Sequence, residues 1–120
     1  MAHVSEDRVR DTSTTTGTGT ITLSGTAPTG YITLDDVAST NDTFFYVIQH
    51  RTAAEWEVGL GVKSAADQFT RTAIRSSNGN AAVNFSAGTK DWAIVDPAFL
   101  AFGNVNAQSA SYTLVLGDMF

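Results

Sequence analysis

The fold of this chain is decided by residues 55–62, which read Glu55-Trp56-Glu57-Val58-Gly59-Leu60-Gly61-Val62. Large apolar side chains occupy every second position, and glutamates or glycines stand between them. Because successive side chains on a β-strand point to opposite faces, this alternation predicts one apolar face and one polar or bare face. A half-buried antiparallel strand fits the pattern far better than a helix with its period of 3.6 residues.

Further strands are predicted on both sides of this stretch. Phe69 to Ile74 places Thr70, Thr72 and Ile74 opposite Arg71 and Ala73. The most apolar run is Thr43-Phe44-Phe45-Tyr46-Val47-Ile48-Gln49, whose length suits a central strand packed on both faces. Shorter candidates lie at residues 20–23, 81–85, 91–95 and 111–116. About eight short strands at regular spacing are typical of a sandwich or a small barrel.

The connecting segments carry turn and cap signals. Leu34 to Ser39 predicts one helical turn with Thr33 as its N-cap. Asn78-Gly79 is a strong hairpin-turn signal because both residues tolerate positive φ. The connection at residues 63–68 has no glycine, which favours a loop of four or more residues over a tight turn.

Together these elements predict an all-β fold, a small antiparallel β-sandwich of about eight short strands with at most one short helix. The polar, threonine-rich start predicts an extended N-terminal arm over residues 1–20, followed by a single β-sandwich domain over residues 21–120. The apolar end at Phe120 leaves two interpretations open. Phe120 is buried in this domain or in a neighbour, or the natural polypeptide continues beyond residue 120.

Composition excludes several classes of function. The net charge of -5 argues against nucleic-acid binding, which depends on Lys and Arg at the phosphates. There is no cysteine, so disulfides, thiolate nucleophiles and cysteine-based zinc sites are excluded. The sequence contains no run of about 18 apolar residues, so it predicts no membrane-spanning helix. Charged residues make up 16% of the chain, below the roughly 25% of an ordinary soluble domain, and Thr, Ser, Asn and Gly take their place.

Reaction chemistry is scarce in the sequence. His50 follows an apolar strand directly, where a hydrogen-bonded or surface role is the expectation. Glu55 and Glu57 lie about 7 Å apart on one strand face, a pair that could serve a glycosidase. Cross-strand pairing with Arg71 or Arg75 is the simpler explanation of these two glutamates.

The acidic residues Asp35, Asp36 and Asp42 could contribute to a calcium site, although helix capping and a solvated turn explain them more simply. We therefore assign no catalytic, cofactor-binding or metal-binding residue, and expect a protein that is not an enzyme and needs no cofactor.

Candidate interface residues come from apolar side chains in sparsely charged surroundings. Val4 and Val9 are the aliphatic residues of the arm, and Phe99 and Phe102 stand in the segment Ala98-Phe99-Leu100-Ala101-Phe102-Gly103. Contiguous exposed apolar surface usually marks an interface. The set of candidates is Val4, Val9, Phe99, Phe102 and Phe120. For Phe99 and Phe102, a loop folded back over its own core is an equal alternative.

Several ordered motifs resemble a known kind of virion module. They are Val9-Arg10-Asp11-Thr12, Leu23-Ser24-Gly25 after the Thr-rich residues 14–22, Asp42-Thr43-Phe44-Phe45-Tyr46-Val47-Ile48, Glu55-Trp56-Glu57-Val58-Gly59-Leu60-Gly61, Phe69-Thr70-Arg71-Thr72, Ser76-Ser77-Asn78-Gly79 and Val83-Asn84-Phe85-Ser86-Ala87-Gly88-Thr89-Lys90. Over about residues 9–92 the chain is similar to the β-rich attachment modules near the N-terminus of tailed-bacteriophage tail fibre, tail spike and related structural proteins. The resemblance implies attachment to a tail, portal or capsid, and no catalytic residue carries over. The chain departs from such proteins by ending at Phe120, without a receptor-binding or depolymerase region.

The sequence thus predicts a virion structural protein, made in the host cytoplasm, that forms a homo-oligomer and contacts other virion proteins (tail, portal or capsid). Neither nucleic acid nor membrane is an expected partner. One alternative is a capsid decoration or head-fibre protein. Another, from a different class, is a carbohydrate-binding module that stacks Trp56 or Trp92 on the sugar rings of host-surface glycans.

Overall fold

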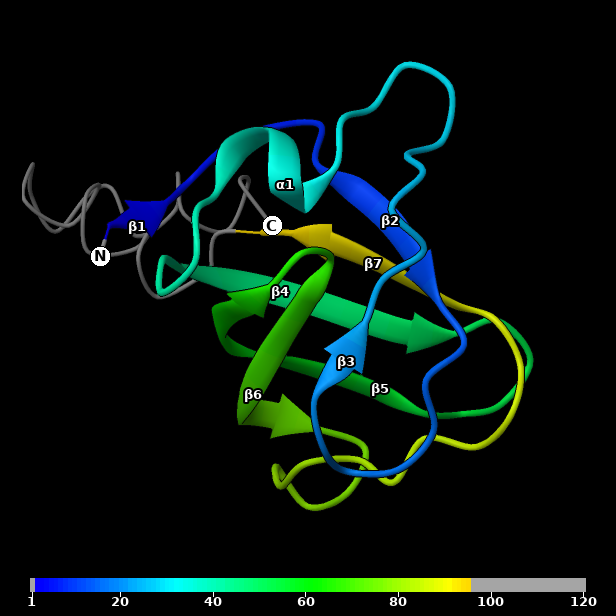
Figure 1. Cartoon of the computed structure of the whole chain (residues 1–120). Helices are drawn as coiled ribbons and strands as arrows, with labels where there is room; N and C mark the ends of the chain where they lie inside the picture. The colour runs from blue at the N-terminus through cyan, green and yellow to red at the C-terminus, as the bar shows by residue number, and fades with distance from the viewer. Residues whose placement is uncertain (1, 96–120) are drawn as a thin grey trace, which may run out of the picture.

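The structure is a computed structural model that describes residues 2–95 (Figure 1). Its elements in chain order are β1 (His3–Val4), β2 (Arg10–Ser13), β3 (Ile21–Thr22), α1 (Leu34–Val37), β4 (Thr43–His50), β5 (Trp56–Ala65), β6 (Gln68–Ser76) and β7 (Lys90–Ile94). The prediction of a small antiparallel all-β fold with one short helix is confirmed for this part of the chain. The predicted strand at residues 111–116 lies outside the described residues.

The strands of residues 2–95 belong to one sheet in the order β2-β7-β4-β5-β6-β3, with β1 attached to β4. Neighbours along this path are antiparallel, and β1 runs parallel to β4. The sheet curls until its two ends nearly meet as a barrel (Figure 1). Two hydrogen bonds join the two ends of the sheet. The Ser24 N–H donates to the Thr12 carbonyl at 2.8 Å, and the Ser13 hydroxyl donates to the Thr22 carbonyl at 2.7 Å. The sequence pattern is shared by sandwiches and small barrels, and the structure takes the barrel form.

Large aromatic rings fill the inside of the barrel. Phe44, Tyr46, Phe69, Phe85 and Trp92 are each at most 1% exposed. Their rings meet edge-on or tilted, as aromatic quadrupoles favour, with centroids 5.0 to 6.4 Å apart among four of them. Strand β4 runs between β5 and β7, which confirms its prediction as a central strand. The expected packing on both faces is wrong, because only one face of β4 is buried and Phe45, Val47 and Gln49 lie on the outer side.

Strand β5 alternates as the sequence indicates, but its apolar side chains lie on the outside. Glu57, Gly59 and Gly61 are buried, and Trp56 is 37% exposed. The reason is space, because a Cβ atom on Gly61 would come within 2.6 Å of Phe44 Cε2, and one on Gly59 within 2.8 Å of the Tyr46 hydroxyl. The interior is already full of rings from β4, so β5 presents its side chains of least volume to them.

The cap and turn predictions have mixed outcomes. Helix α1 starts at the predicted cap, where Asp36 Oδ2 accepts from the Thr33 N–H at 2.9 Å and from its hydroxyl at 3.0 Å. The Asn78-Gly79 turn forms, with the Ala81 N–H donating to the Asn78 carbonyl. The expected long loop at residues 63–68 is wrong, because Ala65 pairs with Gln68 and two residues make the turn. Asp67 supplies the positive φ, 57°, that glycine would otherwise provide.

The segment expected to form an extended arm contributes strands to the barrel. In β1, His3 and Val4 pair with Thr43 and Phe44, and β2 pairs with β7 along its whole length. The loop that follows β2 is tied across one end of the barrel, where Gly17 and Phe85 exchange backbone hydrogen bonds of 2.9 and 3.2 Å.

Candidate functional site

Three ionisable groups inside the barrel, Glu57, Arg71 and Tyr46, are bound to one another. Glu57 and Arg71 form an ion pair of 3.0 Å, with side chains 0% and 1% exposed. Glu57 Oε1 also accepts from the Val83 N–H at 2.8 Å, and its Oε2 accepts from the Tyr46 hydroxyl. Burial, with the Glu57 carboxylate next, raises the pKa of Tyr46 far above its ordinary value. The predicted pairing of Glu57 with Arg71 is confirmed.

Arg71 uses its remaining donors to hold two loops against the end of the barrel. Its Nε donates to the Gly19 carbonyl at 2.9 Å, and its Nη2 donates to the Gly17 carbonyl at 2.9 Å. Nη1 also donates to the Val83 carbonyl at 3.2 Å. The role of this network is structural, because its buried donors and acceptors are spent on the protein itself.

The two glutamates that sequence reasoning weighed as a catalytic pair have different surroundings. Glu57 is fully buried, whereas the half-buried Glu55 accepts hydrogen bonds from the Ser86 N–H and hydroxyl, each at 3.0 Å. The N–H of Ser86 lowers the pKa of Glu55 below its ordinary value. Glu57 has no solvent-accessible surface on which a substrate could lie, so the arrangement does not support two-carboxylate chemistry.

The other residues with possible chemistry also have structural partners. His50 is buried, and its Nδ1 accepts from the Thr52 and Ala53 N–H groups at 3.1 and 3.0 Å. Asp42 accepts from the Ser39 N–H and the Ala2 N–H, which lower its pKa in that order. Within residues 2–95, no three His, Cys, Asp or Glu side chains gather in a way that could hold a metal ion.

The surface without such an internal role is the outer face of the sheet. Strand pairing aligns its side chains in rows that cross the strands. The first row is Trp56, Gln49, Asp91 and Thr12; the second is Arg75, Val58, Val47, Ala93 and Arg10; the third begins with Thr72, Leu60 and Phe45. Apolar side chains therefore dominate the middle of this face, and Ile74, 46% exposed, lies beside them at a bulge. We call these three rows the outer face.

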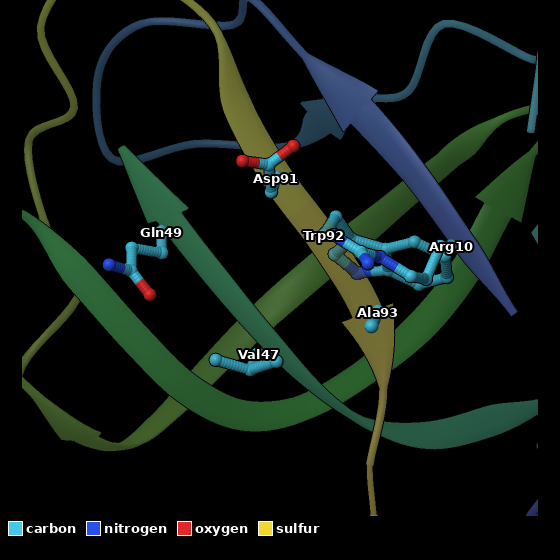
Figure 2. A pocket seen from close by; sticks show the side chains of 6 residues that line it. All are labelled: Arg10, Val47, Gln49, Asp91, Trp92 and Ala93. Atoms are coloured by element: carbon cyan, nitrogen blue, oxygen red, sulfur yellow. The ribbon is translucent and has the colours of Figure 1, made fainter. Parts of the chain in front are cut away.

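A shallow depression of about 290 Å³ lies at the β2 end of the outer face. Figure 2 shows its lining, with Val47 and Gln49 on β4, Asp91, Trp92 and Ala93 on β7, and Arg10 on β2. The depression forms because Ala93 is the smallest side chain of its row and stands between Val47 and Arg10. Its floor is apolar, and charged and amide groups surround it.

Ion pairing and stacking hold the charged groups at this rim. Arg51 binds Asp91 with both Nε and Nη2, at 2.9 to 3.3 Å, and lowers the pKa of Asp91, with a smaller effect from Arg10. The guanidinium carbons of Arg8 and Arg10 lie 4.7 and 5.2 Å from the centre of the Tyr31 ring. Within residues 2–95, neither Arg10 nor Arg75 forms an ion pair.

The structure places the interface candidates from the sequence in two groups. Val4 and Val9 are 9% and 1% exposed and pack in the core of their own domain, so they line no free surface here. Phe99, Phe102 and Phe120 lie outside the described residues. Of the two tryptophans considered for sugar stacking, Trp92 is buried and Trp56 is exposed.

Sequence reasoning missed the outer face as a site. The signal was present in the apolar positions of residues 56–62, but alternation alone does not say which side faces the core.

No family model matches the chain, and comparison with curated proteins and with solved structures finds no match. In residues 2–95, no helix has the length and apolarity needed to cross a membrane.

Proposed function

We propose that this chain is a bacteriophage virion structural protein, an anchoring domain of the tail fibre or tail spike type. It would attach to the tail, portal or capsid and assemble with copies of itself. The observation that carries the proposal is the outward apolar side of β5, where Trp56, Val58 and Leu60 are on the surface of the barrel. The ordered motifs that resemble phage attachment modules supply the identity of the assembly.

The proposed mechanism is docking of a stiff body. A nearly closed sheet with a core of packed rings and a buried ion pair can present its outer face without rearrangement, so little ordering entropy is lost on binding. Burying the apolar rows gives affinity, and Trp and Arg are the residue types that most often dominate interface energetics. Symmetric assembly then repeats these contacts, so the combined affinity of the assembly exceeds that of a single contact.

The experiment compares incorporation of surface variants into particles. Val58→Ser with Leu60→Ser should reduce incorporation at least about ten-fold while the melting temperature changes little, because both side chains are only partly buried in the domain. Thr70→Ser, on a polar exposed position of β6, is the control with no expected loss. Normal incorporation of the folded double variant would contradict the proposal.

Location in the particle separates the two structural alternatives. A tail or portal component should label at one vertex and along the tail, and a capsid decoration or head-fibre protein at many positions over the shell. Labelled antibody against the chain, imaged on intact particles, distinguishes them.

A carbohydrate-binding module is the second candidate, favoured by one observation. Trp56 pairs across strands with Gln49, which lines the depression beside Asp91. An exposed ring next to amide and carboxylate groups is a combination that suits sugar rings and their hydroxyls. A glycan array with the native chain and Trp56→Ala would support this function only if binding occurs and is lost in the variant.

A further inference from the structure

The second row of the outer face has an arrangement that limits what can dock on it. Three apolar side chains, Val58, Val47 and Ala93, stand side by side on neighbouring strands, and an arginine stands at each end of the row. We call this set, from Arg75 to Arg10, the arginine-capped row. Four strand spacings separate the two arginines, which is at most about 19 Å between their Cα atoms, and their side chains diverge because the row lies on the convex side of the sheet.

The two cations have no acidic partner that neutralises them in residues 2–95. Arg75 is exposed and forms no ion pair, and Arg10 is stacked on Tyr31. Asp91, the acidic residue near Arg10, is already bound by Arg51. Arg8 adds a further positive charge on the same tyrosine. The row is therefore locally positive at both ends on a chain whose net charge is -5.

We infer that the arginine-capped row docks a polypeptide segment of a partner protein in which carboxylates flank apolar side chains. The apolar centre of the segment would cover Val58 and Val47, and one carboxylate would enter the depression above Ala93 to reach Arg10. The other carboxylate would pair with Arg75. Charge complementarity selects this occupant over a second copy of the chain, because two copies of the row would present arginine to the partner at both ends. The inference deepens the proposed docking function and depends on it.

A synthetic peptide with blocked ends provides the probe, Asp-Ser-Val-Ser-Leu-Ser-Asp. In extended form its two carboxylates lie on one side with the Val and Leu side chains, about 20 Å apart. Titration into the isotope-labelled chain, followed by NMR amide shifts, should move the signals of Arg10, Val47, Val58 and Arg75 saturably. A peptide with Lys in place of both Asp residues should not bind, and added salt should weaken binding of the acidic peptide.

Variants test whether the two arginines act by contact. Arg75→Glu and Arg10→Glu should each weaken peptide binding about ten-fold, and Arg75→Lys should keep most of it, because a rim charge contributes mainly through its sign. Thr18→Glu with Ser64→Glu makes the same change in net charge at two exposed positions outside the row and should cost less than about three-fold. An equal loss in this double variant would show that net charge alone matters and would overturn the inference.

Three other results would also overturn it. The first is equal binding of the lysine peptide. The second is a set of amide shifts that is confined to another surface, or is absent at millimolar peptide. The third is movement of the amide signals of the arginine-capped row with protein concentration alone, which would identify a second copy as the occupant. The proposed docking function has its own test, because loss of incorporation in the Val58 and Leu60 double variant does not depend on the arginines. If that loss occurs while the peptide does not bind, docking stands and the acidic partner is wrong.

Discussion

Glu57 and Arg71 come from neighbouring strands and meet inside the barrel, with Oε1 and Nη1 3.0 Å apart and both side chains essentially without exposed surface. The pair does more than neutralise charge, since Arg71 also binds the carbonyls of Gly17 and Gly19. It therefore joins the sheet to the loop that closes one end of the barrel.

Replacing Arg71 should be among the most damaging single changes to stability. Arg71→Met leaves the Glu57 carboxylate buried without its counter-charge, which costs about 3–5 kcal/mol in comparable pairs. Urea denaturation measures this loss. The double variant with Glu57→Leu should be more stable than Arg71→Met alone, because no buried charge remains unpaired. A loss below about 1 kcal/mol in Arg71→Met would refute the structural role given to the pair.

The glycines of β5 make a second prediction. A Cβ atom on Gly59 would lie 2.3 Å from the Thr72 carbonyl oxygen, and one on Gly61 would lie 2.6 Å from the Phe44 ring. Gly59→Ala and Gly61→Ala should each destabilise the domain by about 1–3 kcal/mol or more. Gly19→Ala is the matched control, since no atom lies within 4 Å of its added Cβ, and its melting temperature should stay within a few degrees. Adding Phe44→Leu should relieve Gly61→Ala but not Gly59→Ala, which clashes with the Thr72 carbonyl and the Tyr46 hydroxyl.

The two tryptophans provide a direct optical check on which side of β5 faces outward. Trp92 is 1% exposed and Trp56 is 37% exposed. In Trp56→Phe the remaining fluorescence should be blue-shifted and resistant to iodide, whereas Trp92→Phe should leave a red-shifted emission that iodide quenches. Equal quenching in two folded variants would show that β5 is oriented the other way.

Asp67 and Asp91 should have opposite effects on the pH dependence of stability. Burial, then the charges of Asp35 and Asp11, raises the pKa of Asp67 above its ordinary value of 3.8, so its charged form destabilises the folded state. Asp67→Asn should therefore raise stability at pH 7, by less than about 1 kcal/mol at this partly exposed site, and change little at pH 3.

Asp91→Asn is the control of opposite sign. Arg51 holds the pKa of Asp91 below 3.8, so its stabilisation is present at neutral pH and disappears as pH falls through its folded-state pKa. Asp91→Asn should be less stable than the native chain at pH 7, and this difference in stability should shrink as the pH is lowered. Denaturant titrations at pH 3, 5 and 7 compare the two variants, and parallel pH profiles would contradict both assignments.

Local sequence determined β4, β5, β6 and the start of α1, whereas β1 and β2 formed where an extended arm was expected. Alternation at residues 56–62 specified a strand because the side-chain period of two is a property of the backbone. The apolar run of residues 43–49 specified the central strand β4, and Thr33 with Asp36 specified the start of α1 through a local hydrogen bond. The pairing of Glu57 with Arg71 could be foreseen because both residues lie on adjacent strand candidates.

Only the tertiary structure decided which side of β5 faces the core, and with it where the outer face lies. A strand's alternation is symmetric between its two sides, so the choice depends on the volume that remains inside a closed sheet. Rings from β4, β6 and β7 fill that volume, which leaves room for Gly59 and Gly61 but not for Val58 and Leu60. Strand pairing through β5, β4 and β7 places Arg10 and Arg75, 65 residues apart in the sequence, at the two ends of one row.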